Sequence, residues 1–471
     1  MTKRANNTPA STSSNQAQID EKIIHLYESR KKIYPREVKG IFAKIRDNGL
    51  VVLLAIYFLL PWLNWDNRQA ILFDMPNRRF YIFDIVIWPQ DLIILTLFLF
   101  IMAMTLFFLT ALVGRVWCGY ACPQTIWTEA FIWLERFAEG SRIQQIKLDK
   151  QPWNAQKIRK KVTKHALWII LALWTGLTFV GYFTAIRALI PDFFTLSASF
   201  AATFWALFYA GATYLNAGWL REQFCKTMCP YARFQGAMYD ENTLLIAYDK
   251  QRGEPRRKAK RGENQDGHCI DCNLCVQVCP VGIDIRDGNQ SECINCSLCI
   301  DACNDVMDQI EAPRGLIRYA SDNEMMGKKT RYIRPKTIGY GVILAVGISV
   351  LIYQVITISA IELNIKRDRN ILARYAPNNQ IENVYSINLL NKTLDDANYE
   401  ISAAGIDGLT VQGAQTGFSV KSGEVFDTTI RILADKDLLT NYNTPIELIV
   451  KNTTTGEVHR SQTRFLNVTR D

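Results

Sequence analysis

Cysteine is the residue type in this chain best suited to chemistry, and eight of its 12 cysteines fall in two evenly spaced runs. Both runs read C-x2-C-x2-C-x3-C, and Pro280 follows the first. This spacing is typical of two-cluster ferredoxins, in which three cysteines of a run bind one 4Fe–4S cluster and the fourth binds the other. The crossed pattern predicts one cluster held by Cys269, Cys272, Cys275 and Cys303, and a second held by Cys293, Cys296, Cys299 and Cys279.

Zinc ions or disulfides are the alternative use of these cysteines. Zinc sites usually pair two short C-x2-4-C hooks and have no need of triplets with a crossed fourth ligand. Apolar residues between the cysteines, such as Ile270 and Ile294, can form the dry shell that tunes a cluster's potential. Asn304 stands where a second proline is expected, which leaves the turn after Cys303 undetermined. The pattern favours two adjacent clusters that carry electrons.

The other four cysteines form two further motifs of the form C-x3-C-P, each with an arginine just upstream. The cysteines are Cys118, Cys122, Cys225 and Cys229, and the arginines are Arg115 and Arg221. This spacing puts two thiols one helical turn apart, and the proline suits the first turn of a new helix. We expect each motif at a bend between a membrane span and an interfacial helix, over 125–138 and 232–240.

These four thiols could share one soft-metal site at the membrane edge. Thiolates, with the Met228 thioether beside them, select Cu(I), zinc or iron–sulfur over hard cations. The alternative is that they are helix-end cysteines that pack as small apolar groups.

The elements that position these motifs include membrane spans. Hydrophobic residues make up 49% of the chain although long stretches are highly charged, so the apolar residues are bunched. We expect five spans, at 50–63, 92–113, 166–189, 193–218 and 337–361, of which the first is short. Before them, 1–18 reads as a disordered tail without a cleavable signal peptide. The basic amphipathic segment 19–48 suits the membrane surface or a packed surface helix.

Arginine and lysine set the expected orientation of these spans. Segments 1–49, 115–165 and 218–336 hold 10, 10 and 18 of them, whereas 64–90 holds three and 187–197 holds one. Because positive residues accumulate on the cytoplasmic side, the N-terminus and the cysteine domain are expected in the cytoplasm. The C-terminal domain is then extracytoplasmic.

The formal net charge of +9 raises the question of nucleic-acid binding. From residue 362 onward there are 12 basic and 14 acidic residues, so the excess lies in the inner, membrane-proximal segments. The basic run 256–261 is better explained as a linker that faces lipid. We therefore expect a lipid membrane, and no nucleic acid, among the partners.

The C-terminal region alternates apolar and polar residues at 385–389, 418–421, 428–432 and 445–450, with turn residues between these stretches. About seven short strands in about 100 residues predict an all-β, immunoglobulin-like sandwich. Its chemistry-bearing residues form no catalytic constellation, so we expect it to dock a partner or to act as a structural cap.

The whole chain resembles the CcoG/FixG/RdxA family of bacterial cytochrome c oxidase accessory proteins. The resemblance rests on KKIYPR at 31–36, LFDMPN at 72–77, WPQD at 88–91, both C-x3-C-P motifs and the paired cysteine runs. It implies an inner-membrane factor for maturation of the cbb-type oxidase that reduces Cu(II) to Cu(I), which would make the chain a cupric reductase. Copper would bind at Cys118, Cys122, Cys225 and Cys229. Oxidase subunits, copper chaperones and a cytoplasmic electron donor are the implied partners.

The expected organisation is that of a multidomain membrane protein with a five-helix transmembrane bundle, an α+β ferredoxin domain and an immunoglobulin-like sandwich. Its parts are a cytoplasmic tail and amphipathic segment (1–49), four spans with both C-x3-C-P motifs (50–240), the cytoplasmic ferredoxin domain (241–336), a fifth span (337–361) and the periplasmic sandwich (365–471). Two other functions stay open. One is a quinol-linked membrane ferredoxin that serves a periplasmic reductase, and the other is an assembly scaffold without redox activity.

Overall fold

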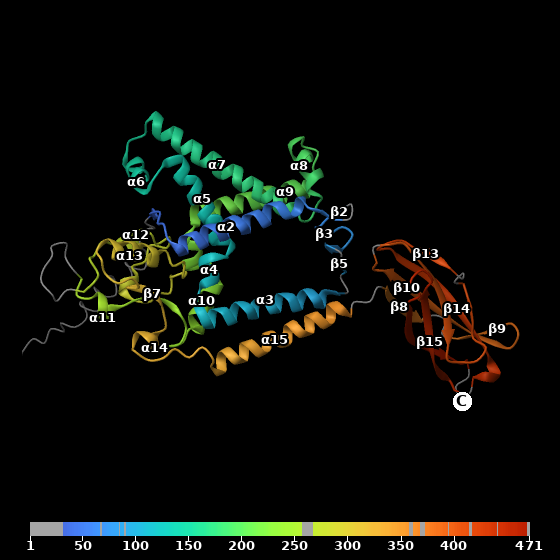
Figure 1. Ribbon diagram of the computed structural model, residues 1–471. Coiled ribbons are helices and arrows are strands. Elements are labelled where there is room, and N and C mark those ends of the chain that lie inside the picture. The colour runs from blue at the N-terminus through green and yellow to red at the C-terminus, as the bar shows by residue number, and fades with distance from the viewer. Residues whose placement is uncertain are drawn as a thin grey trace, which may run out of the picture. The chain divides into compact units, whose positions relative to one another are not determined.

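The computed structural model describes residues 32–65, 68–83, 85–88, 91–256, 267–357, 361–367, 373–393, 395–413, 417–439 and 441–468. The predicted tail (1–18), residues 19–31 of the predicted amphipathic segment and residues 257–261 of the basic run lie outside them. The chain divides into two compact units, and Figure 1 labels many of the helices and strands that they contain. The first is built from Met1–Ile56, Leu106–Gly176 and Leu207–Thr337, and the second from Tyr57–Thr105, Leu177–Ala206 and Ile338–Asp471.

Helices and the cysteine domain make up the first unit. Wholly or in part, it contains α2 (Ile41–Leu59), α3 (Leu92–Val113), α4 (Val116–Tyr120), α5 (Pro123–Glu139), α6 (Arg142–Lys150), α7 (Ala155–Val180), α9 (Phe200–Thr213), the π-helical η3 (Tyr214–Leu220) and η4 (Phe224–Met228), and α10 (Pro230–Met238). Phe131, Trp168 and Ala217 pack together where α5, α7 and η3 meet. The Trp168 indole also donates to the Phe131 carbonyl at 3.0 Å, which fixes α7 on α5.

The cysteine domain has the predicted α+β structure. Its strands β6 (Leu245–Tyr248) and β7 (Ile317–Ala320) pair antiparallel. Between them lie α11 (Lys250–Gly253), α12 (Leu274–Gln277), the 3-10 turn η5 (Ile285–Asp287) and α13 (Leu298–Gln309), and α14 (Asp322–Met325) follows. Ile246, Met307 and Leu316 are fully buried and form a core together with Cys269 and Cys275. The strand pair thus backs the loops that carry the cysteines.

The turn after Cys303 differs from the one after Cys279. Pro280 ends the first run, whereas α13 continues past Cys303 to Gln309. Asn304, which replaces the second proline, keeps its backbone helical, and its side chain accepts from the Gly315 amide at 3.0 Å. A proline at this position would interrupt the helix.

Three helices among the described residues are long and apolar enough to cross a membrane: Leu92–Val113, Ala155–Val180 and Pro335–Ile356 (α15). The predicted spans 50–63 and 193–218 also fall on helices, α2 and α9 with η3. However, α2 carries three charged residues in its first two turns, and α9 has only 14 residues. Of the five predicted spans, three thus fall on clearly apolar helices and two on helices that are more polar or shorter.

The boundaries predicted for the first, third and fifth spans were wrong. The first span belongs to a helix that begins at Ile41, because the polar first turns of α2 find partners within the first unit. The fifth span ends at Ile356, and Ile361 instead opens a strand, where it is 3% exposed in the sandwich core. The residues on both sides of the change from helix to strand are apolar, so hydrophobicity alone did not indicate where the helix ends.

The third predicted span, 166–189, is two helices. Helix α7 ends at Val180, and α8 (Ile186–Phe194) follows a turn. The buried amide of Gln69 stabilises that turn because it donates to the Gly181 carbonyl at 2.7 Å and accepts from the Ile186 amide at 3.2 Å. Gln69 belongs to a β-structured segment made of β1 (Asn64–Trp65), β2 (Arg68–Gln69), β3 (Ile71–Asp74), β4 (Arg79–Ile82) and β5 (Ile85–Ile87).

Two antiparallel sheets form the C-terminal sandwich, as predicted. One has the order β12-β14-β10-β8 with β9 beside β10, and the other has the order β13-β11-β15-β16. The strands are β8 (Ile361–Arg367), β9 (Arg374–Ala376), β10 (Gln380–Asn391), β11 (Ala397–Ala404), β12 (Thr410–Gln412), β13 (Phe418–Val420), β14 (Val425–Asp435), β15 (Asn443–Asn452) and β16 (Val458–Leu466), with the turn η6 (Lys436–Leu438) before β15. Tyr385, Tyr399 and Phe465 are fully buried in the core between the sheets.

Candidate functional site

Four cysteines line one small apolar cavity of the cysteine domain. They are Cys269, Cys272, Cys275 and Cys303, the set that the crossed spacing assigns to one cluster. Most of the remaining wall is apolar and includes Ile270, Leu274, Val306, Met307, Leu316 and Ile317. Burial raises the pKa of Cys275 to about 11 and that of Cys303 to about 12. Such thiols lose their protons when cations bind them, so this donor set in a dry wall fits an iron–sulfur cluster.

The other four ferredoxin cysteines line a second apolar cavity. Cys279, Cys293, Cys296 and Cys299 surround it, together with isoleucines and valine. Burial raises the pKa of Cys293 to about 12 and that of Cys296 to about 11. Cys275 reaches the wall of both cavities, so the two candidate cluster sites are immediate neighbours.

Neither set of four ferredoxin cysteines is arranged around a single central atom. Among the described residues, no group of three or more Cys, His, Asp or Glu side chains is arranged to hold a single metal ion. In a four-iron cluster each thiolate binds its own iron atom, so the ligands surround a cavity.

The two runs also repeat one backbone conformation. Asp271 and Asn273 have φ of 51° and 56°, and Asn295 and Ser297 have φ of 53° and 62° at the equivalent positions of the second run. Asn and Asp tolerate this left-handed region better than most residues with a side chain. These turns curl each loop around its cavity.

Arg286 closes the first loop. It is 5% exposed and donates to the Asp271 carboxylate at 2.5 Å, the Asn273 amide oxygen at 2.5 Å and the Asp284 carboxylate at 2.6 Å. Arg286 also lines the first cavity. Sequence analysis missed it, although Arg286 is the one basic residue between the two runs.

Each C-x3-C-P motif lies at a bend, as predicted. Cys118 belongs to α4, and Pro123 begins α5. Cys225 belongs to η4, and Pro230 begins α10. The cysteine before each proline has an extended backbone, which is the conformation that a following proline requires.

The two C-x3-C-P motifs lie near each other, which spacing alone does not reveal, although among the described residues their four thiols are not arranged to hold a single metal ion. Burial raises the pKa of Cys118 to about 12, and the thiolates of Cys122, Cys225 and Cys229 add to the shift. Burial and the same neighbours raise the pKa of Cys225 to about 11, while Arg115 opposes both shifts. All four cysteines are intermediate in exposure, and they are called the thiol quartet below.

Side chains from α3, α4 and α10 hold this thiol quartet in place. Gln235, which is fully buried, accepts from the Cys118 thiol at 3.6 Å and contacts the Thr110 hydroxyl at 3.4 Å. The guanidinium of Arg115 donates to the Ala232 carbonyl. Met228, the predicted thioether ligand, is 58% exposed.

Arg221, the second upstream arginine, joins its motif to α5. Its guanidinium donates to the Glu135 carboxylate at 2.6 Å, and Lys32 and Lys164 lie 3.3 and 3.6 Å from the same carboxylate. Burial alone would raise the pKa of Glu135, but Arg221 and the two lysines lower it to about 2. Because α5 begins at Pro123 of the first motif, this ion pair links both motifs.

The second cysteine run contacts the thiol quartet directly. Cys118 packs against a buried group that contains Ile294 and Cys296. A Cβ on Gly119 would lie 2.7 Å from the Ile294 carbonyl oxygen, so only glycine permits this approach. The Asn295 side chain donates to the Val113 carbonyl at 3.2 Å. Sequence analysis did not identify Gly119 or Asn295 as functional.

Helix α2 completes the surroundings of the second run. The Asp301 carboxylate of α13 accepts from the Ala43 amide at 2.8 Å, in the first turn of α2, where a negative charge is favourable. One turn on, Arg46 is 6% exposed and pairs with Glu129 of α5 at 2.9 Å. Burial raises the pKa of Cys296, and the positive charge of Arg46 lowers it in part.

Three family profiles match the chain. A profile described as a 4Fe-4S dicluster domain covers residues 220–322, and one described as a 4Fe-4S binding domain covers residues 95–140. A third, for the immunoglobulin-like fold at the C-terminus of FixG, covers residues 351–467. The first two profiles also include the C-x3-C-P motifs.

Curated relatives align over most of the chain. The nitrogen fixation protein FixG of Rhizobium meliloti is 38% identical over 83% of this chain and 83% of its own length. Protein RdxB of Cereibacter sphaeroides is 40% identical over 88% of this chain and 92% of its own length. Protein RdxA of the same organism is 41% identical over 82% of this chain and 84% of its own length.

Proposed function

This chain belongs to the FixG/RdxA family of membrane-associated iron–sulfur redox proteins, and we propose that it reduces Cu(II) to Cu(I) for delivery to a cbb-type cytochrome oxidase. One observation carries the proposal: the two C-x3-C-P motifs lie near each other, and Cys118 packs against the second ferredoxin run. We infer that a site for soft metal ions adjoins a site for one-electron carriers.

Eight cysteines are proposed as iron ligands. Cys269, Cys272, Cys275 and Cys303 would hold one 4Fe–4S cluster, and Cys293, Cys296, Cys299 and Cys279 the other. When bound, the clusters supply one-electron transfer. The surrounding isoleucines, leucines and valines exclude water, and Arg286 and Asn295 hold the two loops in position.

Copper is the proposed substrate of the thiol quartet. Reduction of Cu(II) to Cu(I) takes one electron per ion, and thiolates favour the softer product. Cys118, Cys122, Cys225 and Cys229 would bind the ion, with the Met228 thioether as a further ligand. Arg115 offsets part of the negative charge that four thiolates bring together.

The proposal includes a multi-pass topology in the bacterial inner membrane. Helices α2 and α9 would cross the membrane together with the three apolar helices. The distribution of arginine and lysine supports a cytoplasmic cysteine domain and a periplasmic sandwich. Electrons would come from a donor on the cytoplasmic side, and oxidase subunits or copper chaperones would receive the Cu(I).

An anaerobic single-turnover experiment tests the proposal. The detergent-purified protein is reduced, freed of reductant and mixed with Cu(II) and a coloured Cu(I)-selective chelator. Cu(I) should appear while the iron–sulfur absorbance shows oxidation. The double variant Cys225→Ser plus Cys229→Ser should keep its iron but lose the fast phase. Clusters that stay reduced in the presence of Cu(II) would exclude copper reduction and favour the quinol-linked carrier or the scaffold.

A second candidate is a third iron–sulfur cluster in the thiol quartet. The match of a 4Fe-4S binding profile to residues 95–140, which contain Cys118 and Cys122, favours it. Iron analysis separates the two candidates. Two clusters give about eight iron atoms per chain, and three give about twelve.

A further inference from the structure

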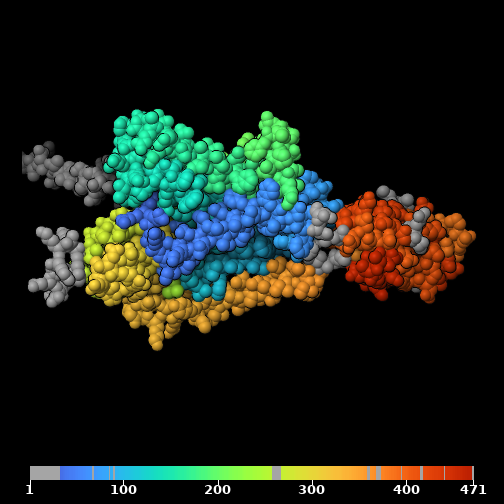
Figure 2. All heavy atoms as spheres, turned by 45° about the horizontal axis from the view of Figure 1, so that its top comes forward, coloured from blue at the N-terminus to red at the C-terminus, as the bar shows by residue number. Residues whose placement is uncertain are grey.

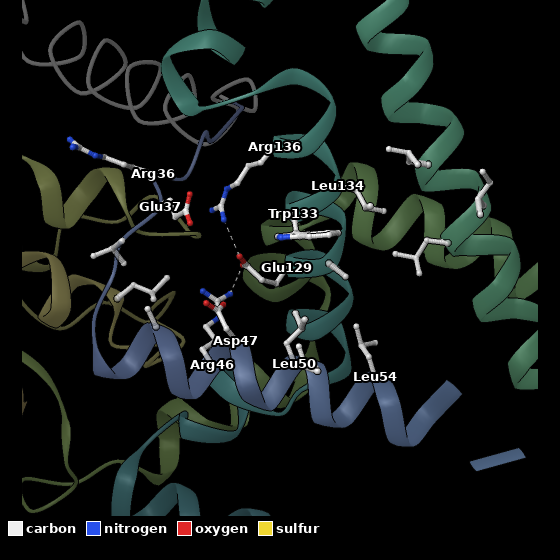
Figure 3. Close-up of a pocket in the computed structure, with 18 of the residues that line it drawn as sticks. Arg36, Glu37, Arg46, Asp47, Leu50, Leu54, Glu129, Trp133, Leu134 and Arg136 are labelled. Atoms are coloured by element: carbon white, nitrogen blue, oxygen red, sulfur yellow. Dashed lines mark hydrogen bonds and ion pairs between the residues drawn. The ribbon is translucent and has the colours of Figure 1, made fainter. Parts of the chain in front are cut away.

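The first unit contains a cavity of about 670 Å³ whose lining includes no cysteine. It lies among α2, α5 and α7, which are the blue and teal segments of the space-filling view (Figure 2). Figure 3 shows side chains from these helices that point into it. This cavity belongs to none of the candidate metal sites, so they do not explain it.

One end of the cavity is polar, with equal numbers of positive and negative side chains. Three arginines and three carboxylates line it: Arg36, Arg46, Arg136, Glu37, Asp47 and Glu129. Glu129 lies 2.9 Å from Arg46 and 3.6 Å from Arg136 (Figure 3). An anionic headgroup finds no excess of positive charge here, whereas a neutral head with oxygen atoms finds both donors and acceptors.

The rest of the lining is apolar. Leucines and tryptophans supply most of it: Leu50, Leu54, Leu134, Leu167, Leu171, Trp133 and Trp174. Trp133 and Ile170 are each 64% exposed, so this part of the cavity opens to the surface of the helices. An apolar tail can therefore leave the cavity between them.

The polar end lies next to the candidate metal sites. Leu298 lines the cavity, and it follows Cys296 by two residues in the second run. Arg46 lines both this cavity and a smaller neighbouring one, which Cys225 and Ile294 also line. A molecule whose head contacts Arg46 would therefore sit beside the second run.

We propose that this cavity binds a membrane quinol, which is a neutral ring with two oxygen atoms and a long apolar tail. The inference rests on the proposed function, and it makes a membrane quinol, rather than a soluble cytoplasmic donor, the source of the electrons. Oxidation of one quinol to quinone releases two electrons and two protons. The two clusters each take one electron, and the exposed carboxylate of Asp47 accepts the two protons one after the other and passes each to solvent.

Binding and electron transfer are tested with a decyl-substituted benzoquinone and its quinol on the detergent-purified full chain. Leu54→Trp fills the cavity without touching its charges. Val52→Trp is the matched control, since Val52 lies on the same helix, is 54% exposed and does not line the cavity. Val51→Trp, at a lining residue that is 63% exposed, serves if Leu54→Trp does not fold.

Wild type and Val52→Trp should bind one quinone per chain, and their iron–sulfur absorbance should bleach when quinol is added anaerobically. Leu54→Trp should bind at least about tenfold more weakly. After chemical reduction, however, it should still reduce Cu(II) at the wild-type rate, which separates failure of this inference from failure of the proposed function. Equal binding by all variants, or no binding by any, overturns the inference. Co-purified phospholipid that Leu54→Trp displaces would show a lipid occupant instead.

Discussion

The two cysteine runs share their spacing and their left-handed turns, but their surroundings differ. The first run includes Cys272, which is exposed, and Arg286 of the same domain closes its loop. The cysteines of the second run are buried or intermediate, and its loop is held by Val113 and packs on Gly119. A repeated motif thus supplies two similar candidate ligand sets, and we propose that the surroundings determine which set exchanges electrons with the rest of the protein.

The strongest test of this difference removes one ligand from each run. Cys296→Ser should lose about half of the iron and nearly all Cu(II) reduction, because the second run adjoins the thiol quartet. Cys272→Ser should also lose iron, yet retain at least about tenfold more activity, a difference of about 1.4 kcal/mol in the barrier. Iron analysis and single-turnover Cu(I) formation measure both. Equal activities in the two variants would remove the distinction between the runs.

Arg286→Gln should destabilise the first run alone. Asp271 and Asp284 are 46% and 24% exposed, so water screens their charges once Arg286 is gone, and the loss of these charge-assisted hydrogen bonds should cost about 1.5–3 kcal/mol. The matched control is Arg314→Gln, since Arg314 pairs with Asp308 at the surface, where its side chain is 65% exposed. The rate at which a chelator removes iron, followed by absorbance, should rise for about half of the iron in Arg286→Gln. Loss of all the iron at one rate would mean that the runs are not independent.

Glu135→Gln should weaken the link between the two C-x3-C-P motifs. The pKa of Glu135 is lowered from 4.5 to about 2, so its contribution is fully present above pH 4.5 and is lost as the pH falls toward 2. The shift corresponds to about 3 kcal/mol. Thermal unfolding midpoints from pH 7 to pH 3 should therefore differ most from wild type at the upper end. Glu400→Gln, at an exposed position of β11, should match wild type throughout. A Glu135→Gln difference that grows on acidification would contradict this assignment.

Gly119→Ala should have the smallest effect. Its Cβ would overlap the carbonyl oxygens of Ile294 and Asn295, and overpacking of this kind costs about 1–3 kcal/mol. We expect slower Cu(I) formation with unchanged iron content. Gly236→Ala is the control, since a Cβ there meets nothing within 4 Å. Wild-type rates in Gly119→Ala would show that this close approach is not needed for electron transfer.

The sequence predicted what depends on local spacing. Crossed C-x2-C-x2-C-x3-C runs, prolines after C-x3-C, and the alternation at 428–432 each fix structure within a few residues. The sequence did not reveal features that arise from distant contacts. Gln69 ends α7 early through hydrogen bonds to Gly181 and Ile186, and the polar start of α2 is stabilised by Glu129 and Asp301. The meeting of Cys118 with Cys225 likewise depends on how α4 and η4 pack.

Copper K-edge X-ray absorption of the Cu(I)-loaded protein tests the central claim most directly. If the thiol quartet is the copper site, the spectrum will show sulfur as the only ligand atom type, and Cys118→Ser will bind less copper while its iron content stays at about eight atoms per chain. Copper held by nitrogen or oxygen, or a quartet already filled by about four further iron atoms, would contradict it.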